Sequence, residues 1–485
     1  MTAAACSLSG ALRPPAKRQR RSGPLSACRA QAHQTAEADV VVVGAGAAGL
    51  AAAHFAAVSG ARVLVLEKMD EAGKKICISG GTRCNVLPAE VDLQRDFFTE
   101  SSQSALRAIF STWSLDDCQY WLSDRHQVGI PLELEAATKK YFPASNSGAE
   151  VRDKLVASCR RYGVAFQHGA ALQDLAALPG GGWRVQLAGG GALEAPRVVL
   201  ATGGLSYPKL GTTGDGFQVL RHHGHSLHEP YAALTPLLGE HPGGQQLAGI
   251  SLYDAELAAV PVAAPDGSGN GAGGAGGGKR RLSKKGTRAQ RTAMLFTHRG
   301  FSGPAILDLS HHTVQALDRG QTPPALRMQW TPAGAAEWEA RLQGGGAALA
   351  VGVLRREGVP QRLAEALCLE AGVPLDRKLS ELKRGERAAL VAALTQYRLH
   401  ITGHEGYPKA EVTGGGVPLN ELDCSSLESR RLPGVHVCGE LCDVFGRIGG
   451  FNFYFAFVSG RLAGLAAAEG AAAASSAQRT PSVGA

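Results

Sequence analysis

The stretch Asp39-Val-Val-Val-Val-Gly-Ala-Gly-Ala-Ala-Gly-Leu50 decides the fold class of this chain. Its four valines are typical of a parallel strand that is buried on both faces. Gly44 permits a tight turn, Gly46 lets a pyrophosphate approach the backbone, and Gly49 lets the next helix pack close to the strand. The helix N-terminus offers unpaired N–H groups and the positive end of its dipole to phosphates. The stretch therefore predicts a strand, a turn and a helix around a bound dinucleotide.

A second strand follows this helix and ends on an acid. Glu67 closes the run 61–67, and seventeen residues separate it from Gly49, so its carboxylate can accept the hydroxyls of an adenosine ribose. An acid at this place favours an unphosphorylated ribose. Two alternatives are a glycine trio that only packs a helix and a membrane span over 40–58, which is long enough. The spaced acid argues against the first, and three glycines and His54 argue against the second.

The composition excludes several classes of protein. The chain has 485 residues and 44% hydrophobic content, enough for a large core and two or three domains. No other window has about eighteen uninterrupted apolar residues, so we expect no membrane association. The ten cysteines form no C-x-x-C pair, so neither a disulfide framework nor a metal site is expected.

The first 36 residues are basic and lack acids, and they are rich in Ala, Ser and Pro. This composition is typical of an organellar transit peptide, and a disordered basic arm is the alternative. We expect a chloroplast location, with the mitochondrion as the alternative. The formal charge of +8 falls to about +2 without this segment, so the basic composition gives little support to a nucleic-acid partner.

The pattern along the chain predicts an α/β protein with a discontinuous Rossmann-like dinucleotide domain, a small inserted β-barrel and a helical subdomain. A Gly-rich segment at 265–291 interrupts the barrel region and is expected to be disordered. Its basic end could touch RNA, although a solvated insertion is the simpler interpretation. The expected segments are the dinucleotide domain (39–205 and 400–468), the barrel (206–335), the helical subdomain (336–399) and a frayed tail (469–485).

Three separate segments fit one ligand, FAD. They are the glycine turn with Glu67, the strand end at 201–203, and a second strand end at 439–443 that leads to the helix after Gly450. We expect Asp443 to accept hydroxyls of the flavin ribityl chain, and a helix cap is the alternative. The helix N-terminus would face the N1/C2 edge of the flavin ring, where negative charge accumulates on reduction.

Longer motifs resemble those of the BaiN-like and aminoacetone-oxidase-like FAD-dependent oxidoreductases, over about residues 39–468. The most specific are Ser79-Gly-Gly-Thr-Arg-Cys-Asn85 and Thr297-His-Arg-Gly-Phe-Ser-Gly-Pro304. The resemblance implies a discontinuous FAD domain, an inserted six-stranded barrel and a small helical bundle. It also implies that residues 164–172 cover the adenine. The chain departs from the usual family pattern at Thr82, Phe445 and Ile448.

The motifs and the resemblance together give a set of expected cofactor-binding residues. The cations of the loop 68–85 could sit on phosphates, although a solvated basic loop is the alternative. The resemblance implies that Lys74, Lys75 and the run Arg83-Cys-Asn85 lie near the cofactor. The expected set is Gly44, Gly46, Ala47, Ala48, Gly49, Glu67, Lys68, Lys74, Lys75, Arg83, Cys84, Asn85, Leu172, Ala201, Thr202, Gly203, Asp443, Gly449, Gly450, Phe451 and Asn452.

We therefore expect an FAD-dependent oxidoreductase that exchanges hydride between flavin N5 and a small organic substrate. No second G-x-G-x-x-G follows a strand after residue 206, so NAD(P)H, if it is the electron donor, would enter through the substrate pocket. The alternatives are a flavin-dependent RNA-modifying protein and a flavin-binding scaffold without turnover. His298 is either structural or a proton donor. The sequence assigns no catalytic residue and no oligomeric state.

Overall fold

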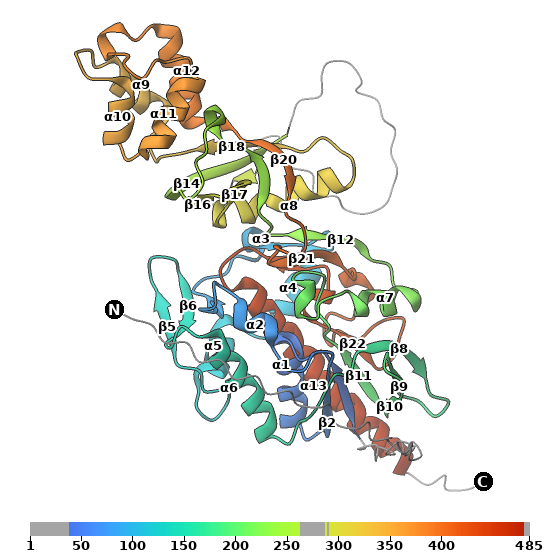
Figure 1. Ribbon diagram of the computed structural model, residues 1–485. Coiled ribbons are helices and arrows are strands. Elements are labelled where there is room, and N and C mark those ends of the chain that lie inside the picture. The colour runs from blue at the N-terminus through green and yellow to red at the C-terminus, as the bar shows by residue number, and fades with distance from the viewer. Residues whose placement is uncertain (1–37, 262–286, 289–290, 480–485) are drawn as a thin grey trace, which may run out of the picture. The chain divides into compact units, whose positions relative to one another are not determined.

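A five-stranded parallel sheet forms the base of the protein in the computed structural model, which describes residues 38–261, 287–288 and 291–479 (Figure 1). The strand order is β22-β11-β1-β2-β7. Every residue of β1 is buried, as the run of valines predicts. The strands are β1 (Val40–Val43), β2 (Val63–Glu67), β7 (Ala165–His168), β11 (Arg197–Leu200) and β22 (Val435–Val437).

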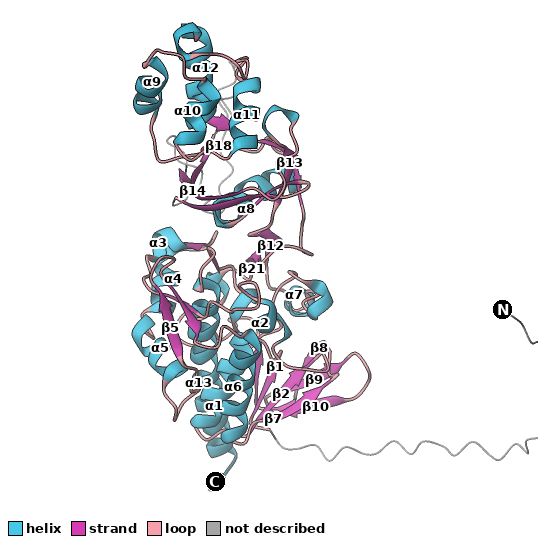
Figure 2. Cartoon of the chain, turned by 60° about the vertical axis from the view of Figure 1, so that its left-hand side comes forward, coloured by secondary structure: helices cyan, strands magenta, loops and turns pink. Residues whose placement is uncertain are grey.

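Helices cover one face of this sheet and a small antiparallel sheet covers the other (Figure 2). The helices are α1 (Ala47–Val58), α6 (Gly148–Arg161) and α13 (Phe451–Arg479). The antiparallel strands are β8 (Leu172–Ala177), β9 (Trp183–Leu187) and β10 (Ala192–Ala195). A Cβ atom on Gly460 or Gly464 of α13 would overlap a carbonyl oxygen of α1. The two glycines therefore let the first and last helices of the chain pack backbone to backbone.

Shorter elements connect β2 to α6. They are α2 (Lys74–Ile78), β3 (Leu87–Pro88), α3 (Leu93–Asp96), β4 (Phe97–Phe98), α4 (Gln103–Phe110), α5 (Leu115–Ser123), β5 (Leu132–Glu135) and β6 (Lys140–Pro143). β3, β6 and β5 form a sheet, and β4 pairs with β23 (Phe445–Gly446) from the C-terminal part of the chain.

A second antiparallel sheet closes into a ring. Its order is β19-β18-β14-β16-β17-β13-β20, with β15 (Thr287–Arg288) paired to β14. β19 and β20 stand at the two ends of this strand order, and only Leu399 separates them in the chain. The two therefore form one bent strand, which closes the sheet into a ring of six strands. The strands are β13 (Leu237–Glu240), β14 (Ser251–Val260), β16 (Thr292–Phe296), β17 (Gly300–Ser302), β18 (Ala325–Gln329), β19 (Tyr397–Arg398) and β20 (His400–His404). The ring occurs where the resemblance implies a six-stranded barrel.

Five helices belong to the same half of the molecule. The helix α8 (Pro304–Asp318) follows β17 and packs on the ring. Four more lie between β18 and β19 around the buried side chains of Trp338, Leu354, Leu367 and Leu394. These are α9 (Ala335–Gln343), α10 (Ala350–Arg356), α11 (Gln361–Glu370) and α12 (Arg384–Thr395).

The two hydrophobic cores place the boundaries differently from the sequence analysis. The dinucleotide core includes α7 (Asp215–His222) and resumes at Val417, whereas the barrel core runs from Tyr231 to Val412 and has Phe445 as one further member. The expected boundaries near 206 and 400 therefore move inward. Two antiparallel strands link the cores, β12 (His228–Ala233) and β21 (Val412–Gly416).

The expected frayed tail is also corrected. Residues 469–479 continue α13, and Ala471 is buried in the dinucleotide core. Residues 1–36 and most of 265–291, for which we expected a transit peptide and a disordered insertion, lie outside the described residues. Among the described helices, none combines the length and the apolar character that a membrane span requires.

Candidate cofactor-binding site

A cavity of about 400 Å³ opens at the carboxyl ends of β1, β2, β11 and β22. This is the edge at which parallel α/β sheets bind ligands. Most of the expected residues line it, from segments far apart in the sequence. They are Gly44, Gly46, Ala47, Ala48, Glu67, Lys68, Lys74, Lys75, Asn85, Leu172, Ala201, Thr202, Gly203, Gly449, Gly450 and Asn452.

The glycine turn fits a pyrophosphate. Gly44 has φ +104°, and a Cβ there would overlap the carbonyl oxygen of Ala201. A Cβ on Gly49 would overlap the carbonyl oxygen of Gly44, so Gly49 packs the helix and does not itself line the cavity. A Cβ on Gly46 would meet no atom within 4 Å and would stand in the cavity. The first turn of α1 has no acid and no side-chain cap, so its N–H groups are available to an anion.

Glu67 lines the cavity and also fixes the turn. One carboxylate oxygen accepts the N–H of Ala45 and the other accepts the N–H of Met69, both at 2.8 Å. Each carboxylate oxygen can accept more than one hydrogen bond. The carboxylate can therefore accept a ribose hydroxyl without losing its hold on the turn.

The three lysines of the loop 68–75 line the cavity as paired cations. Lys68 pairs with Asp215 at 2.8 Å, Lys74 with Asp70, and Lys75 with Glu440 at 2.8 Å. Each cation is held in place by a carboxylate, and this pairing limits the net positive charge of the cavity wall.

Two other members of the loop are not brought to the cavity. The guanidinium of Arg83 donates to Asn146 at 2.7 Å and Glu135 at 2.9 Å, and lies 4.1 Å from the centre of the Phe142 ring. Cys84 is fully buried, and burial raises the pKa of its thiol to about 12. The expectation that both lie beside the cofactor is not met, because a carboxylate captures the arginine and the core encloses the cysteine.

Asp443 also lies away from the cavity. One of its carboxylate oxygens accepts the N–H groups of Glu100 and Ser101 and the hydroxyls of Thr99 and Ser101, each at 2.9 Å. His228 Nδ1 lies 2.8 Å from the same oxygen. The side chain is 3% exposed and is not part of the cavity wall. The expected ribityl contact is corrected, and Asp443 instead joins the loop 99–101 to β12.

Glu440 lines the cavity at the end of β22. It accepts the N–H of Thr413 at 2.7 Å and the hydroxyl of Ser206 at 3.0 Å, besides its pair with Lys75. The sequence could have indicated this residue, because the cavity lies at the carboxyl end of β22 and Glu440 comes three residues after the last residue of that strand. Asp443 comes one turn later and is therefore farther from the strand end.

The N-terminus of α13 faces the cavity through Gly449 and Gly450. Their φ values are +132° and +92°, and a Cβ on Gly450 would overlap the backbone of Leu87. Asn452 lines the cavity, but its amide binds the backbone N–H and C=O of Gly446, both at 2.8 Å. Phe451 points into the core against Phe97 and does not line the cavity.

The positions that depart from the family pattern have different surroundings. Thr82 is exposed and has φ +73°, a conformation that favours glycine. Phe445 is buried and stacks on Phe98, with 4.9 Å between the ring centres. Ile448 lines the cavity and donates its N–H to Asp308 at 2.8 Å. Of the three, only the change at Ile448 alters the cavity wall.

The barrel half closes one end of the cavity with an apolar wall of Leu234, Pro304 and Leu307. Tyr207 and Glu411 line the same cavity, and neither side chain forms a hydrogen bond or ion pair with another described residue. Burial raises the pKa of the Glu411 carboxyl, although Lys75 opposes the shift. Burial, and then the charge of Glu411, raises the pKa of the Tyr207 hydroxyl. The cavity thus holds two titratable side chains without hydrogen-bond or ion-pair partners among the described residues, and the sequence analysis did not identify either of them.

His298 is exposed in the turn between β16 and β17 and does not line the cavity. The position of His298 therefore gives no support to a role as proton donor.

The model of the HI0933-like protein Rossmann domain matches residues 38–466. The chain belongs to this family of FAD-binding oxidoreductases. The resemblance inferred from the motifs is thereby confirmed. The match covers both halves of the dinucleotide domain and the barrel between them.

Individual relatives are similar over nearly their whole length. A ribosomal RNA dihydrouridine synthase of Escherichia coli (strain K12) is 30% identical over 433 residues, which cover 87% of this chain and 96% of that protein. A 3-dehydro-bile acid Δ(4,6)-reductase of Clostridium scindens is 29% identical over 440 residues, 88% of this chain and 98% of the relative. The crystal structure of a 3-ketosteroid-Δ4-(5α)-dehydrogenase from Rhodococcus jostii RHA1 matches with a TM-score of 0.47 and 17% identity, over 92% of this chain and 99% of that one.

Proposed function

We propose that the protein is an FAD-dependent reductase of carbon–carbon double bonds conjugated to a carbonyl group, acting on a small organic substrate. The observation that carries this proposal is the presence of uncommitted Tyr207 and Glu411 side chains in the cavity whose other wall fits a dinucleotide. Reduction of a conjugated double bond requires a hydride at the β carbon and a proton at the α carbon. Bound FAD, once reduced by the electron donor, would supply the hydride.

The residues that would hold FAD are those of the cavity wall. The N–H groups of Ala47 and Ala48 would bind the pyrophosphate, and Glu67 the adenosine ribose. Glu440 and Lys75, which line the cavity, would bind the ribityl hydroxyls, the role that the sequence analysis gives to Asp443. The N-terminus of α13 would stabilise negative charge at the pyrimidine edge of the flavin.

The two donors have different tasks in this proposal. Tyr207 keeps its proton over the physiological pH range, because its pKa is raised, so its hydroxyl can donate a hydrogen bond to the substrate carbonyl. Burial raises the pKa of Glu411, so this carboxyl keeps its proton to a higher pH than an ordinary glutamate does and can deliver it to the α carbon. The apolar wall of Leu234, Pro304 and Leu307 excludes water from this step.

The names of the two relatives support reduction of this kind of bond. Dihydrouridine synthesis saturates a uracil double bond that is conjugated to a carbonyl, and a Δ(4,6)-reductase of a 3-dehydro-bile acid acts on double bonds conjugated to the 3-oxo group. The two substrates share this group and differ in everything else. The shared chemistry is therefore the part that we carry over to this chain.

The test is an anaerobic mixing experiment with the reduced holoprotein. Cyclic enones should reoxidise the flavin and gain two hydrogen atoms by mass spectrometry, whereas matched alkenes without the carbonyl should not react. Reaction of saturated alcohols or amines with the oxidised flavin, with no reaction of any enone, would contradict the proposal. The same apparatus tests whether NADH or NADPH, which we propose as electron donor, reduces the flavin.

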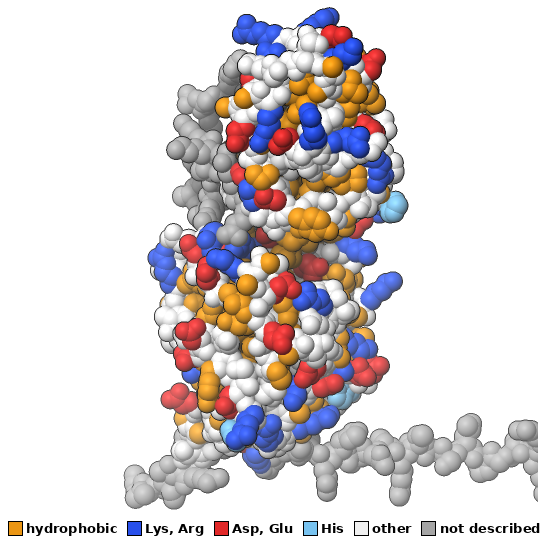
Figure 3. Space-filling view, turned by 90° about the vertical axis from the view of Figure 1, so that its left-hand side faces the viewer, with side chains coloured by type: hydrophobic (Ala, Val, Ile, Leu, Met, Phe, Trp, Pro, Cys, Tyr) orange, Lys and Arg blue, Asp and Glu red, His pale blue; other side chains and the backbone are white. Residues whose placement is uncertain are grey.

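The second candidate is reduction of uridine in ribosomal RNA, which the 30% identity to the Escherichia coli enzyme favours. Acidic and basic side chains are interspersed on the face shown in Figure 3, so this face has no continuous basic surface for a phosphate backbone. Reoxidation by a uridine-containing ribosomal fragment, with an affinity that falls steeply with salt, would favour this candidate.

We also propose import into an organelle, on the basis of the basic, acid-free composition of residues 1–36. A fluorescent protein fused to residues 1–45 should enter a chloroplast. A diffuse cytosolic signal would contradict this proposal.

A further inference from the structure

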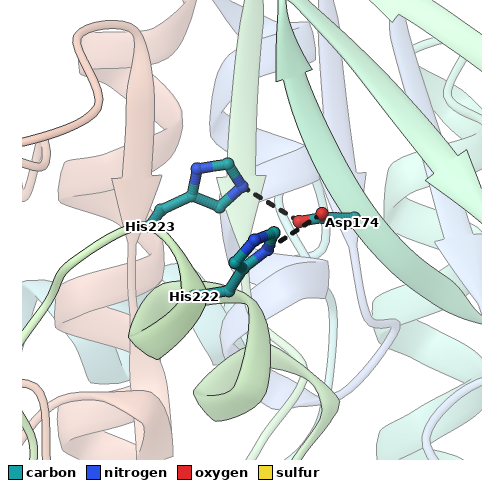
Figure 4. Close-up of side chains that lie close together, drawn as sticks. All are labelled: Asp174, His222 and His223. Carbon is teal, nitrogen blue, oxygen red and sulfur yellow. Dashed lines mark hydrogen bonds and ion pairs between the residues drawn. The ribbon is translucent and has the colours of Figure 1, made fainter.

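Three side chains from two distant segments converge outside the cavity (Figure 4). Asp174 belongs to β8, His222 is the last residue of α7, and His223 is the C-cap of that helix. Asp174 Oδ2 lies 3.0 Å from His222 Nδ1, and Asp174 Oδ1 lies 2.9 Å from His223 Nε2. One potential ligand atom from each residue lies within 4.8 Å of the other two. We expected no metal site from the cysteine pattern, and this cluster contains no cysteine.

We propose that Asp174, His222 and His223 bind a divalent transition-metal ion of the zinc type. Imidazole nitrogen and carboxylate oxygen are ligands that Zn²⁺ prefers, whereas Mg²⁺ and Ca²⁺ require oxygen ligands. Metal–ligand bonds of about 2.0–2.1 Å in a tetrahedron place ligand atoms about 3.3 Å apart. The two imidazoles lie 2.9 and 3.0 Å from different oxygens of Asp174, and one ligand atom of each residue lies within 4.8 Å of the other two, so small side-chain rotations are enough to reach the tetrahedral spacing. Three protein ligands leave a fourth position for water.

Two of the three side chains are held in place before any metal binds. The N–H of Leu175 donates to Asp174 Oδ1 at 2.9 Å and orients the carboxylate. The ring of His223 packs edge-on against Trp183, whose indole N–H donates to the carbonyl of Pro433 at 2.9 Å. His222 is 69% exposed and can rotate to complete the site. An ion can therefore bind with little reorganisation of the backbone.

The site would connect two elements that reach the cofactor cavity. The first residue of α7, Asp215, lines the cavity and pairs with Lys68, and the first residue of β8, Leu172, lines it as well. A metal ion at the other end of α7 would fix this helix to β8. Because the ion binds the folded chain, it should raise the thermal midpoint in a concentration-dependent way.

The experiment uses the full chain with bound FAD, free of affinity tag and treated with a chelator. Calorimetric titration with ZnCl₂ should show one saturable site per chain, and MgCl₂ should show none. The thermal midpoint should rise with Zn²⁺ concentration. Absence of saturable Zn²⁺ binding would overturn the proposal.

Variants locate the site. Replacing a residue that only orients a metal ligand costs about 10–100-fold in metal affinity. Replacing a ligand itself should cost at least as much, so Asp174→Asn and His222→Ala should each weaken Zn²⁺ binding at least about tenfold. His222 is exposed, so its variant should keep the wild-type FAD content and fold. His126→Ala, which removes an exposed histidine elsewhere, should bind Zn²⁺ like the wild type. Unchanged affinity in both Asp174→Asn and His222→Ala would show that the three residues form ion pairs only.

Discussion

Single residues decide the chemistry of the cavity, and Glu411 is the most consequential. Its side chain is half-buried and has no hydrogen-bond partner among the described residues, whereas backbone N–H groups bind Glu67, and Lys75 and a backbone N–H bind Glu440. An acid without partners keeps its proton more readily in a partly buried place. This is the property that a proton donor needs.

Replacement of this acid tests its role. Glu411→Gln should slow flavin reoxidation by an enone about 100-fold or more, with normal FAD content. The wild-type rate should fall as pH rises through the raised pKa of Glu411, because the donor must be protonated, and this limb should vanish in the variant. Glu229→Gln, an exposed acid paired with Arg221, is the control. A Glu411→Gln rate within about twofold of the wild type would assign the proton to another group.

Thr82 has a left-handed backbone conformation. Its φ of +73° is unfavourable for a β-branched side chain, and its side chain is exposed, so glycine loses little contact there. Thr82→Gly should raise the free energy of unfolding by about 1 kcal/mol, measured by urea denaturation. Thr138→Gly, at an exposed position without positive φ, should lower it. A lower free energy of unfolding in Thr82→Gly would show that the positive φ of Thr82 does not strain the folded protein.

At the scale of elements, β12 is tied to the loop before α4 through His228 and Asp443. The hydrogen bond to Asp443 raises the pKa of His228, so the stabilisation is complete below the unfolded pKa and is lost as pH rises through the folded pKa. His228→Gln should therefore lower the free energy of unfolding more at pH 5.5 than at pH 9 (both about one unit or more from the ordinary histidine pKa). Equal losses at the two pH values would show that charge makes no contribution.

The packing of α13 on α1 depends on the absence of side chains. Gly464→Val places a Cβ against the carbonyl oxygen of Ala52 and should destabilise the protein by about 1–3 kcal/mol. Ala472→Val, on an exposed position of the same helix, should cost less than about 1 kcal/mol. Thermal unfolding monitored by circular dichroism distinguishes the two. Equal losses would mean that helix propensity explains both effects.

At the scale of the whole molecule, the sequence predicts what is local. Gly44, Gly46 and Glu67 act within one strand–turn–helix unit, where spacing fixes geometry, and all three line the cavity. Asp443 was misplaced because its direction depends on the loop 99–101, which lies more than 300 residues away in the chain. Arg83 was misplaced because Glu135 and Asn146 bind it.

Other functional residues had no signal that sequence reasoning could use. Tyr207 and Glu411 line one cavity only because the pairing of β12 with β21 brings the chain back beside the segment that follows β11. Asp174 lies beside His222 and His223 only because α7 packs on β8. These are tertiary contacts, and neither residue spacing nor secondary-structure propensity predicts them. The domain boundaries were imprecise for the same reason, since α7 packs on the dinucleotide core instead of the barrel.

The central claim is that this cavity holds FAD with its pyrophosphate against Gly46, and one measurement tests it most directly. A side chain on Gly46 meets no protein atom within 4 Å, and its φ of −79° suits any residue, so Gly46→Val should fold as the wild type does. It should nevertheless fill the space that the pyrophosphate requires. The measurement is the flavin released per chain from the purified proteins. We predict one FAD per wild-type chain and less than about a tenth of that in Gly46→Val, with the same circular dichroism spectrum. Full retention of FAD by Gly46→Val, or release of FMN by the wild type, would contradict the account.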